Sequence, residues 1–239
     1  MADMLLEVQH VTKRFGGFQA LTDVSLQAHQ DERFGLIGPN GSGKTTLINC
    51  ISGALRTDGG RIRFQGTDIT TLPAHQRTRL GIARSFQIPK PFTSMTVLEN
   101  LCIPLIYAAQ THDADVTAEA MEILWRMGLQ AKAGTRATRL SLIELRKLEL
   151  ARAMAARPQL LISDEAMAGL SSSEVDEILA ILTALNERGI SIIMIEHIMR
   201  AVMRFSQRIV VFDAGQIIAQ GTPDEIVRNS AVEKAYLGE

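Results

Sequence analysis

The sequence predicts an α/β fold built around a parallel β-sheet, and two observations predict it. The apolar run Arg33–Ile37 (RFGLI) is followed by a glycine-rich segment and then by a helical pattern at residues 45–53. Further along the chain, the apolar runs 160–163 and 190–195 flank a helical pattern at residues 172–188. A strand–helix–strand order of this kind implies that the two strands pair in parallel in a doubly wound core.

The N-terminal segment predicts a second, antiparallel sheet. We expect strands at residues 5–15, 18–29 and 61–64. Gly16 and Gly17 form a turn signal between the first two strands, and Asp58-Gly59-Gly60 forms one before the third. These strands are expected to form an antiparallel β subdomain around the glycine-rich segment.

The region from about residue 89 to residue 157 predicts a helical subdomain. Prolines are expected to interrupt its beginning, at Pro89, Pro91 and Pro104. Helical patterns follow at residues 116–127 and 140–156. In the first of these, Met121, Leu124 and Trp125 share a face, and Gly128 is a natural stop.

Capping signals mark the helices of the C-terminal third. Ser171 and Glu174 form a capping box before the helix 172–188, and Gly189 is expected to end it. Another strand is expected at residues 208–212. Thr222 and Glu225 form a second capping box, with proline at the first helical position, which opens a terminal helix.

Residues 38–46 (GPNGSGKTT) match the phosphate-binding loop G-x-x-x-x-G-K-[ST]. Its glycines let successive backbone N–H groups surround a phosphate group. Lys44 is expected to reach the β- and γ-phosphate oxygens and Thr45 to ligate Mg²⁺. The alternative is a chance glycine-rich turn, but a strand precedes the loop and a helix follows it, which favours a P-loop NTPase core. The expected nucleotide-binding residues are Gly38, Pro39, Asn40, Gly41, Ser42, Gly43, Lys44, Thr45 and Thr46.

Three further features narrow the class of NTPase. An apolar strand ends in Asp164, expected to hold Mg²⁺ directly or through water, and Glu165, expected to polarise the attacking water. His197 leaves the strand 190–195 at the same sheet edge, where it can hydrogen-bond the γ-phosphate. Gln87 precedes the proline-rich segment, where it can touch the metal or the water. The alternatives are a solvated Asp-Glu pair and a structural histidine, and the phosphate loop upstream favours the catalytic interpretation.

Composition limits the partners and the compartment. The chain has 25 basic and 26 acidic residues and a formal charge of −1, so no nucleic-acid partner is expected. Cys50 and Cys102 lie in apolar surroundings without C-x-x-C spacing, which is consistent with a reducing compartment. The N-terminus has no signal-peptide pattern, and no apolar run approaches the roughly 18 residues needed to span a bilayer.

With these residues in place, the whole sequence resembles the ATP-binding subunit of an ABC transporter. The resemblance maps residues 38–46 to the Walker A loop, Gln87 to the Q-loop, residues 160–165 to Walker B and His197 to the switch histidine. Phe15 lies where the family stacks an aromatic ring on adenine. The resemblance implies ATP and Mg²⁺ as ligands, with Glu165, His197, Lys44 and Gln87 as catalytic residues.

Within this family the sequence is most similar to the branched-chain amino-acid (LivG-type) uptake group. The similar segments are residues 14–17 (RFGG), 86–87 (FQ), 95–100 (MTVLEN), 168–170 (AGL) and 235–239 (AYLGE). The resemblance implies import of a small solute, branched-chain or related amino acids. It also implies a cytoplasmic protein, peripheral on the inner face of the plasma membrane.

The resemblance further implies an organisation and partners. Residues 1–87 are expected to form the N-terminal part of the ATP-binding core, residues 88–157 the helical subdomain with the signature segment, and residues 158–239 the C-terminal part of the core. The helical subdomain contacts integral membrane permease subunits in this family. A second ATP-binding subunit is expected, in a homodimer or a heterodimer.

The sequence departs from the family in the signature, typically LSGGQ, which contacts the nucleotide of the opposite subunit. Residues 140–144 read LSLIE, so Ser141 is kept while both glycines and the glutamine are replaced. One interpretation is weakened contact with the partner's phosphates, because Leu142 and Ile143 add bulk and Glu144 adds negative charge. The other is a tolerated variant, in which Ser141 and Glu144 simply form the capping box of the next helix. The two interpretations are compatible with each other.

Smaller departures accompany this one. Ala166 stands where the family usually has proline, Ile198 replaces an aspartate that often follows the histidine, and Ser171 lies in the D-loop segment. None of them removes a residue expected to act on the chain's own nucleotide.

Three alternative functions are weighed. The first is a regulatory module that holds ATP with weak or no turnover because its signature is altered. The second is a soluble ABC ATPase of repair or translation, although such proteins typically carry two cassettes or long coiled-coil insertions. The third is a phosphotransferase, which would not explain Gln87, the Asp164-Glu165 pair and His197 together. Specificity for the transported solute is expected to reside in the surfaces of the permease and the binding protein.

Overall fold

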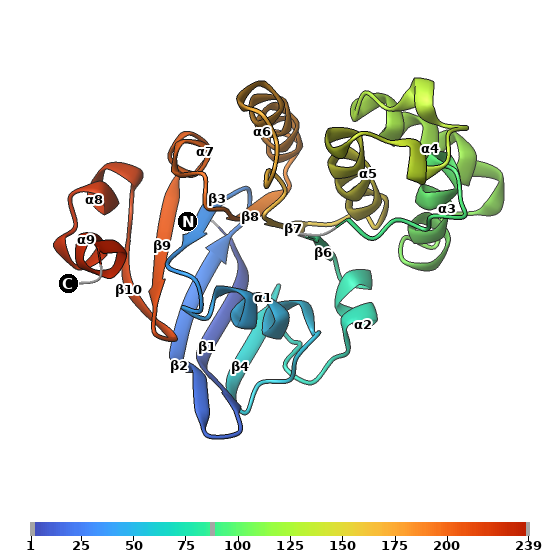
Figure 1. Cartoon of the computed structure of the whole chain (residues 1–239). Coiled ribbons are helices and arrows are strands. Elements are labelled where there is room, and N and C mark those ends of the chain that lie inside the picture. Colours follow the sequence, from blue (N-terminus) through green and yellow to red (C-terminus); the bar gives the residue numbers. More distant parts are fainter. Residues whose placement is uncertain (1–2, 87–88, 238–239) are drawn as a thin grey trace.

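A six-stranded sheet forms the centre of the computed structural model, which describes residues 3–86 and 89–237 (Figure 1). Its strands are β3 (Arg33–Ile37), β6 (Ile82–Ser85), β7 (Leu160–Asp164), β8 (Ser191–Ile195), β9 (Arg208–Asp213) and β10 (Gln216–Gly221). The order is β10-β9-β3-β8-β7-β6, and every pair from β9 to β6 is parallel, as predicted. Every residue of β7 and β8 is buried, as is typical of strands covered on both faces.

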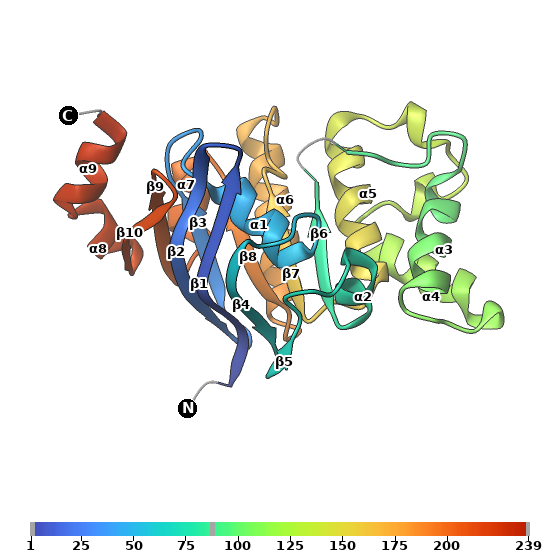
Figure 2. The same cartoon turned by 90° about the horizontal axis from the view of Figure 1, so that it is seen from below.

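The second sheet is antiparallel and has the order β2-β1-β4-β5. Its strands are β1 (Met4–Phe15), β2 (Phe18–His29), β4 (Gly59–Phe64) and β5 (Thr67–Asp68). Helix α1 (Lys44–Ser52) lies between the two sheets (Figure 2). Its Leu47, Ile48 and Ile51 are fully buried in a cluster with residues of both sheets. This packing fixes the helix that follows the phosphate-binding loop.

The remaining helices lie at the two ends and on the outer face of the central sheet. Helices α3 (Val97–Tyr107), α4 (Asp113–Arg126) and α5 (Leu142–Ala155) gather beyond β6, on the right in Figures 1 and 2. The others are α2 (Ala74–Arg79), α6 (Ser172–Asn186), α7 (Met199–Phe205), α8 (Pro223–Val227) and α9 (Ser230–Leu237), with 3₁₀ turns at Gln130–Lys132 and Ala137–Arg139. Among the described residues, no helix is both long and apolar enough to cross a bilayer.

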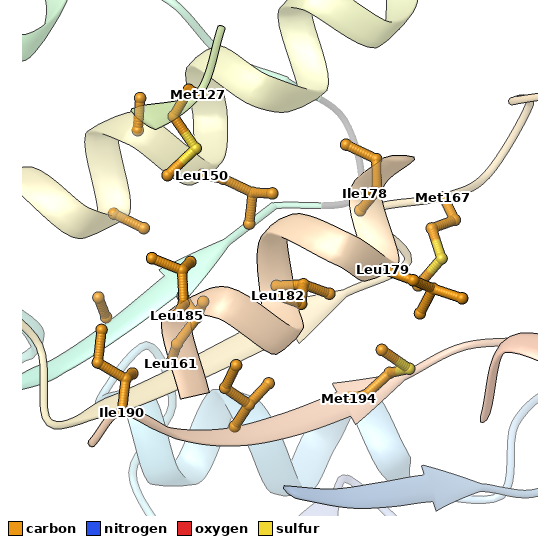
Figure 3. Close-up of a cluster of buried hydrophobic side chains, with 14 of the residues drawn as sticks. Met127, Leu150, Leu161, Met167, Ile178, Leu179, Leu182, Leu185, Ile190 and Met194 are labelled. Carbon is orange, nitrogen blue, oxygen red and sulfur yellow. The ribbon is translucent and has the colours of Figure 1, made fainter. Parts of the chain in front are cut away.

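One hydrophobic core joins the sheet to the helices beyond it. In Figure 3, Leu182 and Leu185 of α6 lie near Leu161 of β7, and Leu150 of α5 extends the cluster toward Met127. The helical region therefore packs on the sheet through shared apolar contacts. The expected subdomain boundaries after residues 87 and 157 stay a prediction.

Pro104 lies inside α3, so the predicted interruption at this proline is wrong. Proline removes a backbone donor and crowds the carbonyl four residues earlier, at a cost of about 3 kcal/mol. The helix forms nevertheless because Val97, Leu101 and Leu105 are fully buried on one face. Burying each such side chain contributes about 1.5–3 kcal/mol.

Two further predictions about helices need correction. In α4 the face predicted to carry Met121, Leu124 and Trp125 is not the one that packs on the core: Leu124 is buried but Met121 and Trp125 are exposed, because the core-facing stripe is Val116, Ala120, Ile123, Leu124 and Met127. The capping box at Thr222 is present but opens only the five-residue α8, and α9 follows as a separate helix. The predicted capping box at Ser171 is confirmed.

Candidate active site

The phosphate-binding loop connects β3 to α1 and is shaped by two glycines. Gly38 and Gly43 have φ angles of +148° and +108°. A Cβ atom on Gly38 would collide with the carbonyl oxygen of Phe212, and one on Gly43 would lie 2.8 Å from the carbonyl oxygen of Ala20. Only glycine therefore allows the neighbouring backbone to approach this closely.

Lys44 is buried at the start of α1, with 6% of its surface exposed. Its Nζ donates hydrogen bonds to the carbonyl oxygens of Gly38, at 2.8 Å, and Pro39, at 2.9 Å. Burial lowers the pKa of Lys44, while the nearby charges of Glu165 and Asp164 raise it. The structure thus brings Lys44 within electrostatic range of both predicted carboxylates.

Asp164 ends β7 and is held by a residue that the sequence analysis did not single out for a role. Arg84 of β6 donates from Nη2 to Asp164 Oδ2 at 2.6 Å and from Nη1 to Asn49 Oδ1 of α1 at 2.6 Å. Both members of the ion pair are largely buried. Because the guanidinium bonds two partners at once, it fixes the Asp164 carboxylate relative to the helix that follows the phosphate loop.

Glu165 and His197 are in contact. His197 Nε2 lies 3.0 Å from Glu165 Oε1, and the backbone N–H of Glu165 donates to the carbonyl of Ile195 at 2.9 Å. Glu165 has a φ of +47°, a left-handed conformation that is uncommon for residues other than glycine. Two residues predicted from separate strands therefore form one pair at the sheet edge.

Glu196, next to His197, is a buried acid whose carboxylate accepts a hydrogen bond from the backbone N–H of Met167 at 2.9 Å. Burial and the neighbouring Glu165 raise the pKa of Glu196 to about 7, although hydrogen bonds from the Met167 and His197 backbones and the charge of Arg146 oppose the rise. Arg146 itself donates to the carbonyl oxygen of Ala168 at 3.0 Å.

Phe15 and Phe18 lie beside the phosphate loop. They line a cavity of about 220 Å³ together with Ala20, Gly41, Ser42, Gly43, Lys44, Thr45 and Thr46. The two aromatic residues face each other across the β1–β2 hairpin, and both are exposed. The cavity therefore offers backbone donors at one end and an apolar ring at the other, which suits a nucleotide.

Ser141 lies at the N-terminus of α5 and is not among the residues lining that cavity. Its hydroxyl accepts a hydrogen bond from the Glu144 N–H, and the Glu144 carboxylate accepts one from the Ser141 N–H at 2.9 Å. Lys132 lies 3.3 Å from the same carboxylate, whose pKa these contacts lower. The predicted capping box is therefore confirmed.

The residues predicted to hold Mg²⁺ present oxygen atoms, the ligands that this ion prefers. Thr45 offers a hydroxyl at the phosphate loop and Asp164 a carboxylate at the end of β7. The described residues hold no cluster of three or more His, Cys, Asp or Glu side chains able to bind a metal. Mg²⁺ in nucleotide-binding sites typically binds through one or two carboxylates and substrate phosphates. Gln87, the third predicted ligand, lies outside the described residues.

Sequence reasoning assigned no role to Arg84, Arg146, Glu196 or Tyr236. A charged residue inside or directly after a short apolar strand is a weak signal that could have marked Arg84 and Glu196. Arg146 gave no such signal. Tyr236 belongs to α9, and burial raises its pKa, while the backbone of Gly38 opposes the rise.

Comparison with known proteins gives consistent matches along the chain. The family described as ABC transporter matches residues 21–168, and the family described as branched-chain amino acid ATP-binding cassette transporter matches residues 216–239. The chain is 39% identical to the high-affinity branched-chain amino acid transport ATP-binding protein LivG of Salmonella typhimurium. It is 37% identical to BraF of Pseudomonas aeruginosa, described in the same terms. Each alignment covers 100% of both chains.

Solved structures of ATP-binding cassettes have the same fold as this chain. A nucleotide-free ATP-binding cassette from an ABC transporter superposes with a TM-score of 0.91 at 31% identity, covering 99% of this chain and 100% of the other. A cassette in its ADP conformation superposes with a TM-score of 0.90 at 32% identity and the same coverage.

Glu196→Gln is expected to raise the free energy of unfolding at about pH 8 and to leave it unchanged at low pH. The folded-state pKa of about 7 exceeds the usual 4.5, so the folded protein binds this proton more tightly than the unfolded chain does. That stabilisation is complete below pH 4.5 and is lost as the pH rises through 7, by up to about 3 kcal/mol.

Urea denaturation of both proteins across this pH range measures the difference. Glu187→Gln, at an exposed acid after α6, is the control for replacing a carboxylate by an amide. Equal stability of wild type and Glu196→Gln at the alkaline end would contradict the prediction.

Proposed function

The chain belongs to the ATP-binding subunits of ABC transporters, of the LivG branched-chain amino-acid type, and from this premise we propose that the site described above hydrolyses ATP to drive solute import. One observation carries the proposal: the phosphate-loop lysine lies within electrostatic range of Asp164 and Glu165, and Glu165 contacts His197. This arrangement brings a phosphate-binding lysine, a base and a polar partner for that base together in one site.

ATP binding is assigned to the loop and to Phe15. The adenine ring stacks on Phe15, and the backbone N–H groups at the start of α1 bind the phosphates, where the helix dipole favours negative charge. Lys44 exchanges its bonds with the Gly38 and Pro39 carbonyls for bonds with phosphate oxygens. That exchange is favourable because a hydrogen bond between two charged groups is stronger than one to a neutral carbonyl.

Hydrolysis is assigned to Glu165 and His197. Glu165 accepts the proton of the attacking water, and its strained backbone keeps the carboxylate directed toward the sheet edge. His197 holds that carboxylate and hydrogen-bonds the γ-phosphate. Thr45, Asp164 and Gln87 are the residues that would hold Mg²⁺, which when bound neutralises charge on the phosphates.

The solute and the location follow from the relatives. Because LivG and BraF are described as high-affinity branched-chain amino acid transport proteins, we assign a branched-chain or related amino acid as the solute. The subunit then works in the cytoplasm, attached to permease subunits at the inner face of the plasma membrane.

Glu165→Gln is expected to bind ATP within about threefold of the wild-type affinity and to lose at least about 100-fold in turnover, because the amide cannot accept a proton. ATPase activity with the partner subunits present, together with nucleotide binding by calorimetry, measures the two effects. The control Glu187→Gln should match wild type. Turnover like that of wild type in Glu165→Gln would reject the assignment.

A cavity of about 420 Å³ between the sheet and the helical region is the place where we propose that the permease docks. Its lining is mostly apolar and includes Phe86, Phe92, Pro104 and Tyr107. Phe86 and Tyr107 are 48% and 67% exposed, so they add to an apolar surface that a partner could cover. Arg84, which bonds Asp164, also lines this cavity, so an occupant touches the residue that orients the metal carboxylate.

Tyr107→Glu is expected to reduce copurification with the permease at least about tenfold and to leave ATP binding by the isolated subunit unchanged. A carboxylate would have to be desolvated on docking, which is costly without a partner. Pull-down from detergent extracts measures the loss. Tyr107→Phe, which keeps the ring, and Trp125→Ala, on another exposed aromatic, are the controls. Retention of the permease by Tyr107→Glu would contradict this docking site.

The second ATP-binding subunit is expected to meet residues 140–144, and we infer that these contacts are weakened. Leu142 is 42% exposed at this surface, where the family has glycine. The Ser141 hydroxyl and the Glu144 carboxylate already bond each other's N–H groups, which leaves them less available to a phosphate. Lys132 offsets part of the negative charge of Glu144. The weakened contacts concern the nucleotide bound by the partner subunit. This favours a heterodimer, in which the other of the two shared nucleotide sites can be intact.

The competing function is a regulatory subunit that holds ATP without productive turnover. ATPase activity measured on the chain alone, and then mixed with a candidate partner subunit, separates the two. We expect activity to rise at least about tenfold on mixing. Activity that is absent in both settings would favour the regulatory function.

A further inference from the structure

Glu196 is a buried acid that the mechanism above does not use. Only 3% of its surface is exposed, and it lies between β8 and His197. Burial raises its pKa to about 7, so at neutral and alkaline pH the folded protein is less stable for carrying it. A buried group that lowers stability beside a catalytic pair is a candidate for a role in the reaction.

The contacts of Glu196 join two segments that carry the catalytic pair. Its Oε1 accepts the Met167 N–H at 2.9 Å, and Glu196 directly precedes His197 in the chain. Met167 lies two residues after Glu165. Glu196 therefore ties the turn that follows the base to the backbone of the histidine that contacts this base.

The turn that carries Glu165 needs such restraint. The positive φ of Glu165 is a strained conformation, which persists only where surrounding contacts hold it. Ala166 does not lock its own backbone as a proline would. The side chain of Met167 is buried beside Leu179 of α6, so this residue is held by its side chain and by Glu196 together (Figure 3).

The charged groups that face Glu196 come from three other positions. Glu165 raises the pKa of its carboxylate and Arg146 of α5 lowers it, while His197 follows directly in sequence. Arg146 also donates to the carbonyl of Ala168, the next residue in the same turn. The turn is thus braced from β8 by Glu196 and from α5 by Arg146.

We propose that Glu196 is a positioning residue that holds the turn after Glu165 against His197, so that the Glu165–His197 contact keeps its geometry during hydrolysis. This inference rests on the proposed roles of Glu165 and His197. The proposed role depends on the length of the side chain rather than on its charge, because Glu196 accepts its hydrogen bond from the backbone N–H of Met167. A side chain of the same length with a neutral acceptor should therefore replace it, and a shorter carboxylate should not.

Two variants separate the effect of the side-chain length of Glu196 from the effect of its charge. Glu196→Gln keeps the length and one acceptor oxygen for the Met167 N–H, so we expect kcat within about threefold of wild type. Glu196→Asp keeps the charge but withdraws the acceptor by one methylene and leaves a buried donor unpaired, so we expect kcat to fall at least about tenfold. In both variants KM and the Kd for ATP should change by less than about threefold, because the phosphate loop is untouched.

Glu32→Ala is the matched control for loss of a partly buried carboxylate. Glu32 accepts the His29 N–H at 2.9 Å and pairs with Arg208, far from the phosphate loop. Its removal is expected to lower Tm while leaving kcat unchanged. Steady-state ATPase assays with the partner subunits, calorimetric ATP binding and thermal unfolding are measured on all four proteins.

A fall in kcat for Glu196→Asp that Glu196→Gln does not share would support the proposal. Wild-type kcat in Glu196→Asp, equal losses in both variants, or a loss of ATP affinity in step with kcat would each overturn it. Glu165→Gln, assayed in parallel, distinguishes a failure of the inference about Glu196 from a failure of the proposed role of Glu165. If that variant is inactive and Glu196→Asp is fully active, only the inference about Glu196 fails. If Glu165→Gln is active, the assignment of the base fails, and this inference fails with it.

Discussion

The balance of charge between Lys44 and the carboxylates of Asp164 and Glu165 is the constraint on which the rest of the site depends. Burial of the lysine lowers its pKa and disfavours its ammonium form, and the two carboxylates oppose this effect in part. Charges removed from water in this way are tolerated only when partners and hydrogen bonds compensate them. Arg84 does so for Asp164, and the loop carbonyls do so for Lys44. The neighbouring residues are therefore part of the electrostatics of the site as well as of its packing.

Sheet topology places these charges together. β8 lies between β3 and β7, and all three are parallel, so the segments that follow them meet at the carboxyl edge of the sheet. Lys44, Glu165 and His197 are far apart in sequence and adjacent for this reason. Glu196 and Arg146 then brace the turn after Glu165 from two different elements.

Helix α5 connects this edge to the surfaces where partners are expected. Ser141 caps its first turn, and Arg146 reaches the turn after Glu165. Further along, Glu149 accepts the backbone N–H of Lys90 at 3.1 Å, and Arg152 donates to the Lys90 carbonyl at 2.8 Å. One helix thus contacts both the turn after Glu165 and the segment beside the proposed docking cavity, which would give the proposed coupling between nucleotide and permease a physical path.

The sequence by itself determined the parallel core, the antiparallel sheet, the phosphate loop and the capping boxes, because each is signalled by patterns of residues close together in the chain. It also identified Lys44, Asp164, Glu165 and His197 as candidates, since each stands at a strand end or in a motif. Tertiary structure decided the rest. Pro104 stays helical and Trp125 faces outward because packing against distant elements outweighs local preference. Arg84 and Glu196 acquire partners only when β6, β7 and β8 align, and no local pattern encodes a contact between residues 80 or 29 positions apart.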